Sequence, residues 1–282
     1  MKVCNCPLQT QKNIQFKAGL NRNIIQTVEA TDVNEVSHRL LKAGIKSDFQ
    51  DDKVLAFCSL KVFEIIESFN KNYKTNFAYP KGVFSRDLSK DFGINDAVGF
   101  YSFTPLKLKS GDNCEGGTVF FDKLKSKIVG NELLNINKIA EIDCSKGYIN
   151  SNHFLINFFH EFSHAIHQGH LQQKYLNVTV NKILQHWVSD DFSDKYMNKY
   201  AKTASKICDY ALENPLEALS CDLSGRFANA LDDNLEIKSD IFVNSPYKDK
   251  SLKSKIRDLF FIKFQNNDVD NLIKKIWDGR LI

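Results

Sequence analysis

One short segment with the pattern HExxH constrains the fold of this chain more than any other. Residues 160–170 read HEFSHAIHQGH, and apolar residues dominate positions 154–166. A helix formed by these residues is apolar over most of its circumference, which predicts that it is buried on nearly all sides. Burying two histidines and a glutamate there without partners would cost on the order of 2 kcal/mol or more for each group. The fold must therefore supply partners for His160, Glu161 and His164, and a metal ion would meet that need.

The spacing within the motif is suited to zinc chemistry. Two histidines four residues apart lie one above the other on a helix, so His160 and His164 can direct their imidazole nitrogens to one ion. Glu161 lies one position round the helix, beside the ion, where it can act as a general base toward water. The same carboxylate can return the proton to a leaving amine. The motif therefore predicts one Zn²⁺ ion, with His160 and His164 as ligands and Glu161 as a catalytic residue.

A zinc site of this kind needs a third protein ligand, and two further histidines are close. His167 lies on the same helix face, but a continuous helix carries it a turn too far to share the ion. His170 stands ten residues after His160, as in HExxHxxGxxH metzincins. In metzincins a glycine seven residues after the first histidine turns the chain back. Here that position is His167, and the glycine is Gly169. The metzincin alternative therefore requires a later break in the helix.

Two carboxylates farther along the chain are the other candidates. They lie in YALENPLEALSCDL, residues 210–223. Pro215 suits the first turn of a helix, and Asn214 suits the position that caps it. Glu217 then takes the third helical position, whereas Glu213 precedes the proline and is expected outside the helix. Two histidines and a glutamate from a second helix form the gluzincin arrangement. This comparison favours Glu217 as the third ligand, with His170 and Glu213 as alternatives.

The two segments together resemble a known family. HEFSHAIH followed by YALENPLEALSCDL is similar to the catalytic domain of anthrax lethal factor and related small gluzincins. The resemblance implies His160, His164 and Glu217 as zinc ligands and Glu161 as the base. It also implies that Tyr210 lies by the metal and assists at the oxyanion, a role that a phenol can fill. A buried core tyrosine is the alternative for Tyr210.

One position departs from the family pattern. Gluzincins usually carry an acidic residue four positions after the ligand glutamate, where it supports a zinc-bound histidine. Here that position is Cys221, and the acid is Asp222, one residue later. The sequence leaves open which of the two supports the histidine.

The predicted function is hydrolysis of peptide bonds by a zinc-dependent endopeptidase, with a protein or peptide substrate held as an added strand along a sheet edge. The resemblance also implies a toxin- or effector-like protease. The alternatives are a metzincin-type protease that uses His170 and a non-catalytic binding protein with a zincin fold. A deformylase would use Cys114 as an upstream ligand, but the EGCLS-like motif of deformylases is absent.

The predicted fold is α+β and zincin-like, with a small mixed sheet followed by the HExxH helix and a mainly helical C-terminal subdomain. Residues 1–20 are expected to form a flexible tail, and residues 21–282 one domain with an N-terminal helical part at 21–95, the sheet and HExxH helix at 96–170, and helices from 171. Strands are predicted at 54–60, 98–103, 118–121 and 136–142. Helices are predicted within 22–43 and at 61–73, 151–168, 171–187, 193–212, 215–230, 248–264 and 268–277.

The composition indicates which binding partners and which cellular compartment to expect for this chain. The chain has 38 basic and 34 acidic residues, a balance that argues against nucleic-acid binding. Its seven scattered cysteines are an odd number, which indicates a reducing compartment rather than a disulfide framework. The N-terminal residues lack the apolar segment of a Sec signal peptide, and no apolar run is long enough for a membrane span. We therefore expect a cytoplasmic protein, or one exported without a Sec signal. The oligomeric state is not predicted.

Overall fold

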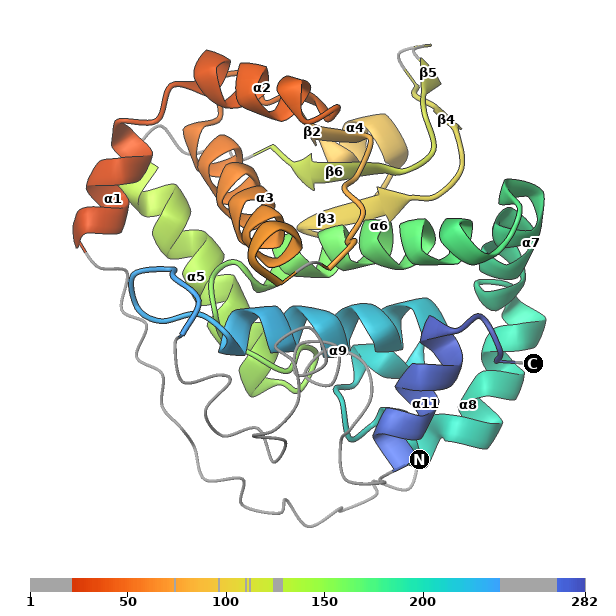
Figure 1. The fold of residues 1–282 in the computed structure, drawn as a ribbon. Helices are drawn as coiled ribbons and strands as arrows, with labels where there is room; N and C mark the ends of the chain where they lie inside the picture. Colours follow the sequence, from red (N-terminus) through yellow and green to blue (C-terminus); the bar gives the residue numbers. More distant parts are fainter. Residues whose placement is uncertain are drawn as a thin grey trace.

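The computed structural model describes residues 22–73, 75–95, 97–109, 111, 113–123, 129–238 and 268–281. Two sequence predictions, the flexible tail at 1–20 and the helix at 248–264, lie outside these residues. Within them the α+β prediction is confirmed in its coarse form, because helices surround a small mixed sheet (Figure 1). No helix among the described residues has the length and apolar character that a membrane crossing requires.

The helices take up most of the described chain. They are α1 (Arg22–Glu29), α2 (Val33–Lys42), α3 (Lys53–Tyr73), α4 (Leu88–Phe92), α5 (Val129–Ser145), α6 (Ile156–Lys174), α7 (Asn177–Trp187), α8 (Asp190–Ala204), the 3-10 turn η1 (Tyr210–Leu212), α9 (Pro215–Asn229) and α11 (Asp268–Trp277). The strands are β1 (Lys46–Asp48), β2 (Gly82–Arg86), β3 (Gly99–Ser102), β4 (Leu106–Lys107), β5 (Asn113–Cys114) and β6 (Thr118–Asp122).

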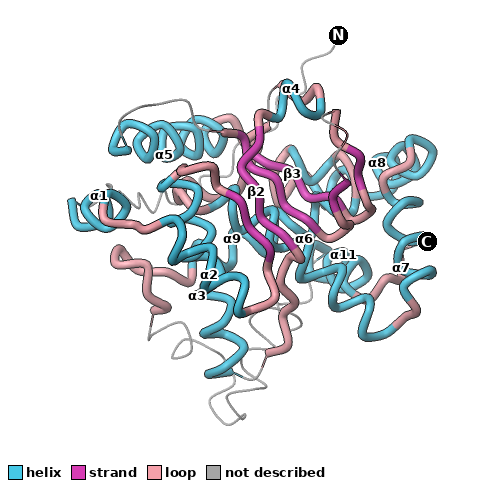
Figure 2. Tube along the Cα trace, turned by 90° about the horizontal axis from the view of Figure 1, so that it is seen from above, coloured by secondary structure: helices cyan, strands magenta, loops and turns pink. Residues whose placement is uncertain are grey.

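Four strands form the main sheet, in the order β1-β2-β6-β3. The first three run parallel, and β3 pairs antiparallel with β6 at one edge. The sheet lies over α6, and α9 lies along the opposite side of α6, as the two views show (Figures 1 and 2). The helix with the HExxH motif is therefore sandwiched between the sheet and a second helix, which explains its apolar circumference.

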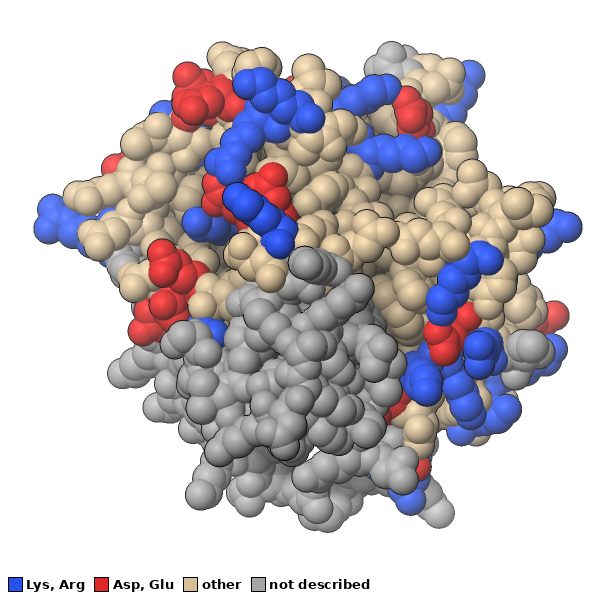
Figure 3. Space-filling view, in the orientation of Figure 1, with Lys and Arg blue, Asp and Glu red and all other residues tan. Residues whose placement is uncertain are grey.

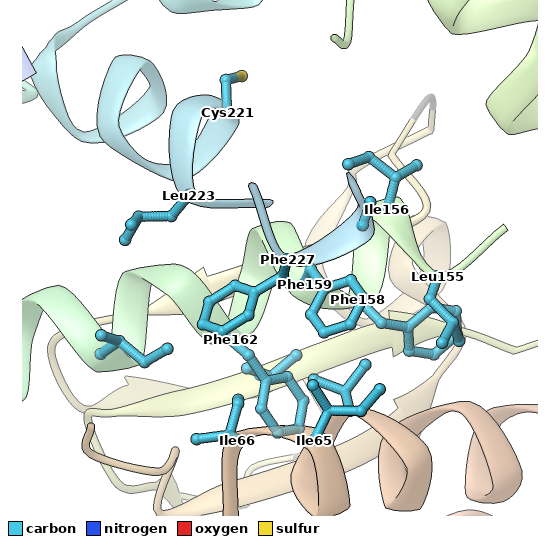
Figure 4. Packing of buried hydrophobic residues seen from close by; sticks show 14 of the residues in the cluster. Ile65, Ile66, Leu155, Ile156, Phe158, Phe159, Phe162, Cys221, Leu223 and Phe227 are labelled. Carbon is cyan, nitrogen blue, oxygen red and sulfur yellow. The ribbon is translucent and has the colours of Figure 1, made fainter. Parts of the chain in front are cut away.

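Aromatic side chains join these layers. Phe121 of β6 packs on Phe158 of α6, with ring centroids 4.4 Å apart. On the other side of α6, Phe159 stacks on Phe227 of α9 at 5.3 Å (Figure 4). All four rings are fully buried, and burying each stabilises the fold by roughly 1.5–3 kcal/mol. The α6–α9 contact is thus part of the hydrophobic core, which holds the backbones of both helices in fixed positions.

Two predicted strands are wrong, because both segments are helical. Residues 54–60 belong to α3, whose first turn Asp52 caps by accepting a hydrogen bond from the Leu55 N–H at 3.0 Å. Residues 136–142 belong to α5, where Leu133, Ile136 and Ala140 are buried at helical spacing. A short apolar run does not by itself distinguish a buried strand from a buried helix.

The predictions for the other strands gave a mixed outcome. The strands at 98–103 and 118–121 are confirmed as β3 and β6. Both β1 and β2 were missed, and they lie in the part at 21–95 that was expected to be helical. β1 is only three residues long and reads KSD, so it carries no apolar pattern.

Most helix predictions hold, with shifted ends. The helices predicted at 215–230 and 268–277 are confirmed as α9 and α11. Asp32 caps α2, which lies in the range 22–43, by accepting hydrogen bonds from the N–H groups of Asn34 and Glu35. The predicted helix at 193–212 divides into α8 and η1, and the one at 171–187 corresponds to the end of α6 and to α7. The helix predicted at 151–168 begins later than expected, because α6 begins at Ile156.

The predicted end of this helix at residue 168 is also wrong, because α6 continues through Gly169 to Lys174. The glycine serves a different purpose, since a Cβ atom at this position would collide with the Cβ atom of Ala78. Gly169 therefore permits close approach between the helix and the segment that leads into β2.

Replacing Gly169 by Ala tests this contact. Alanine in a helix interior normally stabilises by about 0.5–1 kcal/mol relative to glycine. Here we expect Gly169→Ala to lower the free energy of unfolding by about 1–3 kcal/mol, because the added methyl group overpacks the contact. Chemical denaturation of Gly169→Ala, Ala78→Gly and the double variant measures the effect. If Ala78→Gly does not relieve the loss, the contact is not its cause.

The surface in Figure 3 carries both signs of charge. Lys and Arg side chains lie next to Asp and Glu at several places on the described part of this face. The described residues also form ion pairs, among them Lys46–Glu115 at 2.6 Å and Lys174–Asp278 at 2.6 Å. The two signs of charge are therefore interspersed on the described part of this face.

Candidate metal centre

His160, His164 and Glu217 come together between α6 and α9. One ligand atom from each residue lies within 4.8 Å of the others. The histidines lie on the α6 face that meets α9, and Glu217 faces them from the first turn of α9. Their side chains are only 7, 11 and 16% exposed. This buried group is close enough to hold a metal ion.

Both histidines direct the same ring atom to one carboxylate oxygen. His160 Nε2 lies 2.8 Å from Glu217 Oε2, and His164 Nε2 lies 3.6 Å from the same oxygen. The pKa values reflect this contact. Burial would lower the pKa of His160, but the hydrogen bond and the charge of Glu217 raise it to about 9. Burial would raise the pKa of Glu217, but the two histidines hold it well below its usual range. His160 therefore keeps a proton that its Nε2 donates to Glu217 Oε2.

A helix cap explains the position of Glu217. Asn214 Oδ1 accepts hydrogen bonds from the N–H groups of Leu216 at 2.9 Å and Glu217 at 3.2 Å, and Pro215 occupies the first turn. This arrangement is the one predicted from the sequence. Glu213 lies before the proline at the end of η1 and is outside the group. Cys114, on β5, is outside it as well.

The structure places His167 and His170 away from the group, against the C-terminal helix α11. His167 Nε2 lies 3.1 Å from the carbonyl oxygen of Ile276, and its ring stacks on Trp187 and Trp277. The ring of His170 stacks on Trp277 with centroids 3.9 Å apart. Because α6 continues beyond Gly169, His170 does not turn back toward His160. The metzincin set of three histidines is therefore not assembled in the described residues.

The burial of these two histidines predicts a loss of stability in acid. Burial lowers the pKa of His167 to about 3 and that of His170 to about 4, below the unfolded value near 6.5. The unfolded chain therefore binds more protons between pH 6.5 and about 4, so stability falls as the pH falls through this window and levels off above it. For His167 the loss is at most about 1.4 kcal/mol per pH unit.

Denaturation at pH 7 and pH 5 measures this loss. His170→Phe keeps an aromatic ring against Trp277 but removes the ionisable group. We expect this variant to lose less stability between the two pH values than the original protein does. Equal losses in both proteins would contradict the assignment of the acid sensitivity to this cluster.

Glu161 and Tyr210 lie beside the predicted ligands. Glu161 is 7% exposed, and burial raises its pKa, an effect partly opposed by His160 and His164. The ring of Tyr210 lies 5.7 Å from that of His160, and 39% of the residue is exposed. Tyr210 is thus at the edge of the site rather than in the core. Burial of its hydroxyl raises its pKa, so the phenol keeps its proton.

A cleft of about 250 Å³ opens onto this group. Its walls come from β3, α6, α7, η1 and α9, and its lining residues are Gly99, Phe100, Tyr101, Phe103, His160, Glu161, His164, His167, Gln168, Leu184, Val188, Tyr210, Leu216 and Glu217. All three predicted ligands and both predicted catalytic residues are among them. The cleft therefore gives a small molecule or a peptide access to the buried group.

Sequence reasoning missed Tyr101 and Gln168 as residues of the site. The ring of Tyr101 stacks on His164, with centroids 5.8 Å apart, and its hydroxyl donates a hydrogen bond to Gln168 Oε1. Gln168 Nε2 in turn donates to the carbonyl oxygen of Phe103 at 3.4 Å. These contacts join the edge strand β3 to α6. Because the contact depends on sheet pairing, the only sequence signal was the position of Tyr101 in a predicted strand.

The question of Cys221 or Asp222 is decided by their contacts. Cys221 Sγ lies 3.9 Å from His160 Nδ1, whereas both oxygens of Asp222 bind Arg226. A hydrogen bond with Cys208 and burial raise the pKa of Cys221, which keeps it a neutral thiol. Ser220, which the sequence did not single out, lies 2.9 Å from His164 Nδ1 through its hydroxyl. Each histidine therefore has a partner on its second ring nitrogen.

The donor set fits zinc. Two imidazole nitrogens and one carboxylate oxygen, with a cleft beside them, match the ligands of catalytic zinc sites that keep one position open. No protein-family model, curated protein or solved structure matches this chain. The function therefore has to be inferred from the site itself.

Proposed function

We propose that the protein is a zinc-dependent endopeptidase of the gluzincin type, with His160, His164 and Glu217 as zinc ligands. One observation carries the proposal. The Nε2 atoms of both histidines approach the same oxygen of Glu217, at 2.8 and 3.6 Å, where a cleft reaches them. When bound, zinc would polarise a substrate carbonyl and lower the pKa of water.

Glu161 would act as the general base. Glu161 lies on α6 directly after His160 and three residues before His164, the two predicted histidine ligands. The residue also lines the cleft. Burial raises its pKa above the usual range of a carboxyl group, which makes the carboxylate a stronger base. Glu161 would take a proton from the attacking water and deliver it to the leaving amine.

Tyr210 would stabilise negative charge on the substrate oxygen. Its hydroxyl keeps its proton because burial raises the pKa, and the residue lines the cleft together with Glu161 and Glu217. A phenol in this place can donate a hydrogen bond to an oxyanion as it develops. The exposed fraction of 39% favours this role over that of a core residue.

The substrate would bind along β3 as an added strand. β3 is at the edge of the described sheet and lines the cleft through Gly99, Phe100 and Tyr101. The N–H of Asp122 donates to the carbonyl oxygen of Val98 at 2.8 Å, so Val98 and then Phe100 direct their backbone groups toward β6. The backbone groups of Gly99 and Tyr101 consequently point away from β6. An extended peptide could pair with them and run past His160 and His164.

This proposal keeps the resemblance to lethal-factor-like gluzincins, and with it a toxin- or effector-like role, as an interpretation of the motifs. A non-catalytic zincin-fold protein is the second candidate, but an intact Glu161 directed into the cleft would have no purpose there. Purified protein incubated with a peptide library, with and without a metal chelator, tests the proposal. We expect cleavage that the chelator abolishes and added zinc restores. Zinc-loaded protein that cuts no peptide would contradict the peptidase function.

A further inference from the structure

The helix that supplies Glu217 also touches both histidines on the ring nitrogen away from it. Ser220 Oγ lies 2.9 Å from His164 Nδ1, and Cys221 Sγ lies 3.9 Å from His160 Nδ1. These residues stand three and four positions after Glu217, so all three side chains project from one face of α9. One turn of α9 therefore contacts the two imidazole rings at both nitrogens. Glu217 lies at the Nε2 atoms, and Ser220 and Cys221 lie at the Nδ1 atoms.

We propose that Ser220 and Cys221 are positioning residues that hold the two imidazole rings with Nε2 facing a bound metal ion. A histidine binds a metal through one ring nitrogen, and the hydrogen bond of its other nitrogen fixes the ring. With an ion bound, Ser220 Oγ would accept from His164 Nδ1, and Cys221 Sγ from His160 Nδ1. In the structure His160 Nε2 donates to Glu217 Oε2, and an ion would take the place of that proton. The inference rests on the metal site of the proposed function.

The two supports differ in strength. A hydroxyl is a better acceptor than a thiol, and the Ser220 contact is the shorter one. Both partners are uncharged, whereas Asp222, the acid that follows Cys221 in the sequence, is bound to Arg226 at 2.5 and 2.9 Å. Of the two, Ser220 therefore makes the larger contribution to orientation, and loss of its hydroxyl is the more informative test.

Ser224 provides a matched control. It is buried on α9 like Ser220, and both are 1% exposed, but its hydroxyl donates to the carbonyl oxygen of Cys221 at 3.0 Å. We expect Ser220→Ala to weaken zinc binding by about 10–100-fold in a chelator competition, the range for loss of a partner of a metal-bound histidine. Cys221→Ala should cause a smaller loss and Ser224→Ala almost none, while Ser220→Thr should recover much of the affinity.

The comparison of zinc affinities decides the inference, and the rescue by Ser220→Thr separates the hydroxyl from a purely structural effect of the substitution. Equal zinc affinities in Ser220→Ala and Ser224→Ala would overturn the inference while leaving the proposed function intact. A Ser220→Thr variant that recovers no affinity would overturn it as well. If the original protein bound no zinc, the proposed function would fail, and this inference would fail with it.

Discussion

Glu217→Gln is expected to remove high-affinity zinc binding while the fold is retained. The substitution keeps the shape of the side chain but removes the charge that faces both His160 and His164. Loss of a hydrogen-bond partner of a ligand costs about 10–100-fold in metal affinity, so loss of a ligand should exceed about 100-fold. Competition with a chromogenic chelator measures the affinity, and circular dichroism verifies the fold.

Two control variants address the other candidate ligands. Glu213→Gln removes a carboxylate on the other side of Pro215, and His170→Phe keeps the ring that stacks on Trp277. Neither residue belongs to the group at the cleft, so both variants should bind zinc as the original protein does. A loss of zinc in His170→Phe alone would restore the metzincin alternative. A loss in Glu213→Gln alone would move the third ligand to that residue.

Glu161→Gln is expected to abolish most peptide hydrolysis without loss of zinc. The amide cannot accept a proton from water, and a positioned general base contributes about 10²–10⁴-fold to the rate. The proposed ligands His160, His164 and Glu217 are unchanged, so the metal content should stay at one ion per chain. The rate constant for a peptide found in the library screen gives the size of the effect.

Glu132 of α5 supplies the matched control for this variant. Like Glu161 it is a buried glutamate with 7% exposure, and burial raises its pKa as well. It does not line the cleft. Glu132→Gln should therefore keep both zinc and activity. If Glu161→Gln cut peptides as fast as Glu132→Gln, the base would have to be another group.

The ligand group could be predicted from the sequence because each member depends on local rules. The spacing of His160 and His164 fixes their common helix face, and the pair Asn214–Pro215 fixes where α9 begins. From there Glu217 falls in the first turn, and the structure places it against both histidines. Local spacing also argued against His167, whereas His170 stayed an alternative until the structure showed that α6 continues to Lys174.

The sheet was predicted less well, because strand pairing depends on contacts distant in sequence. β1 has no apolar pattern of its own and exists through pairing with β2. The apolar run at 54–60 fits a buried strand as well as a buried helix, and in the structure it belongs to the buried helix α3. Tyr101 reaches His164 only because β3 packs beside α6. Ser220 could have been found by counting three positions on from Glu217, since that spacing lies on the same helix face.

A crystal structure of the zinc-loaded protein, with anomalous scattering recorded at the zinc edge, would test the central claim most directly. The account predicts one ion bound by His160 Nε2, His164 Nε2 and the carboxylate of Glu217, with Glu161 and Tyr210 beside it. Zinc bound through His170 or through cysteine sulfur, or no zinc between α6 and α9, would contradict it.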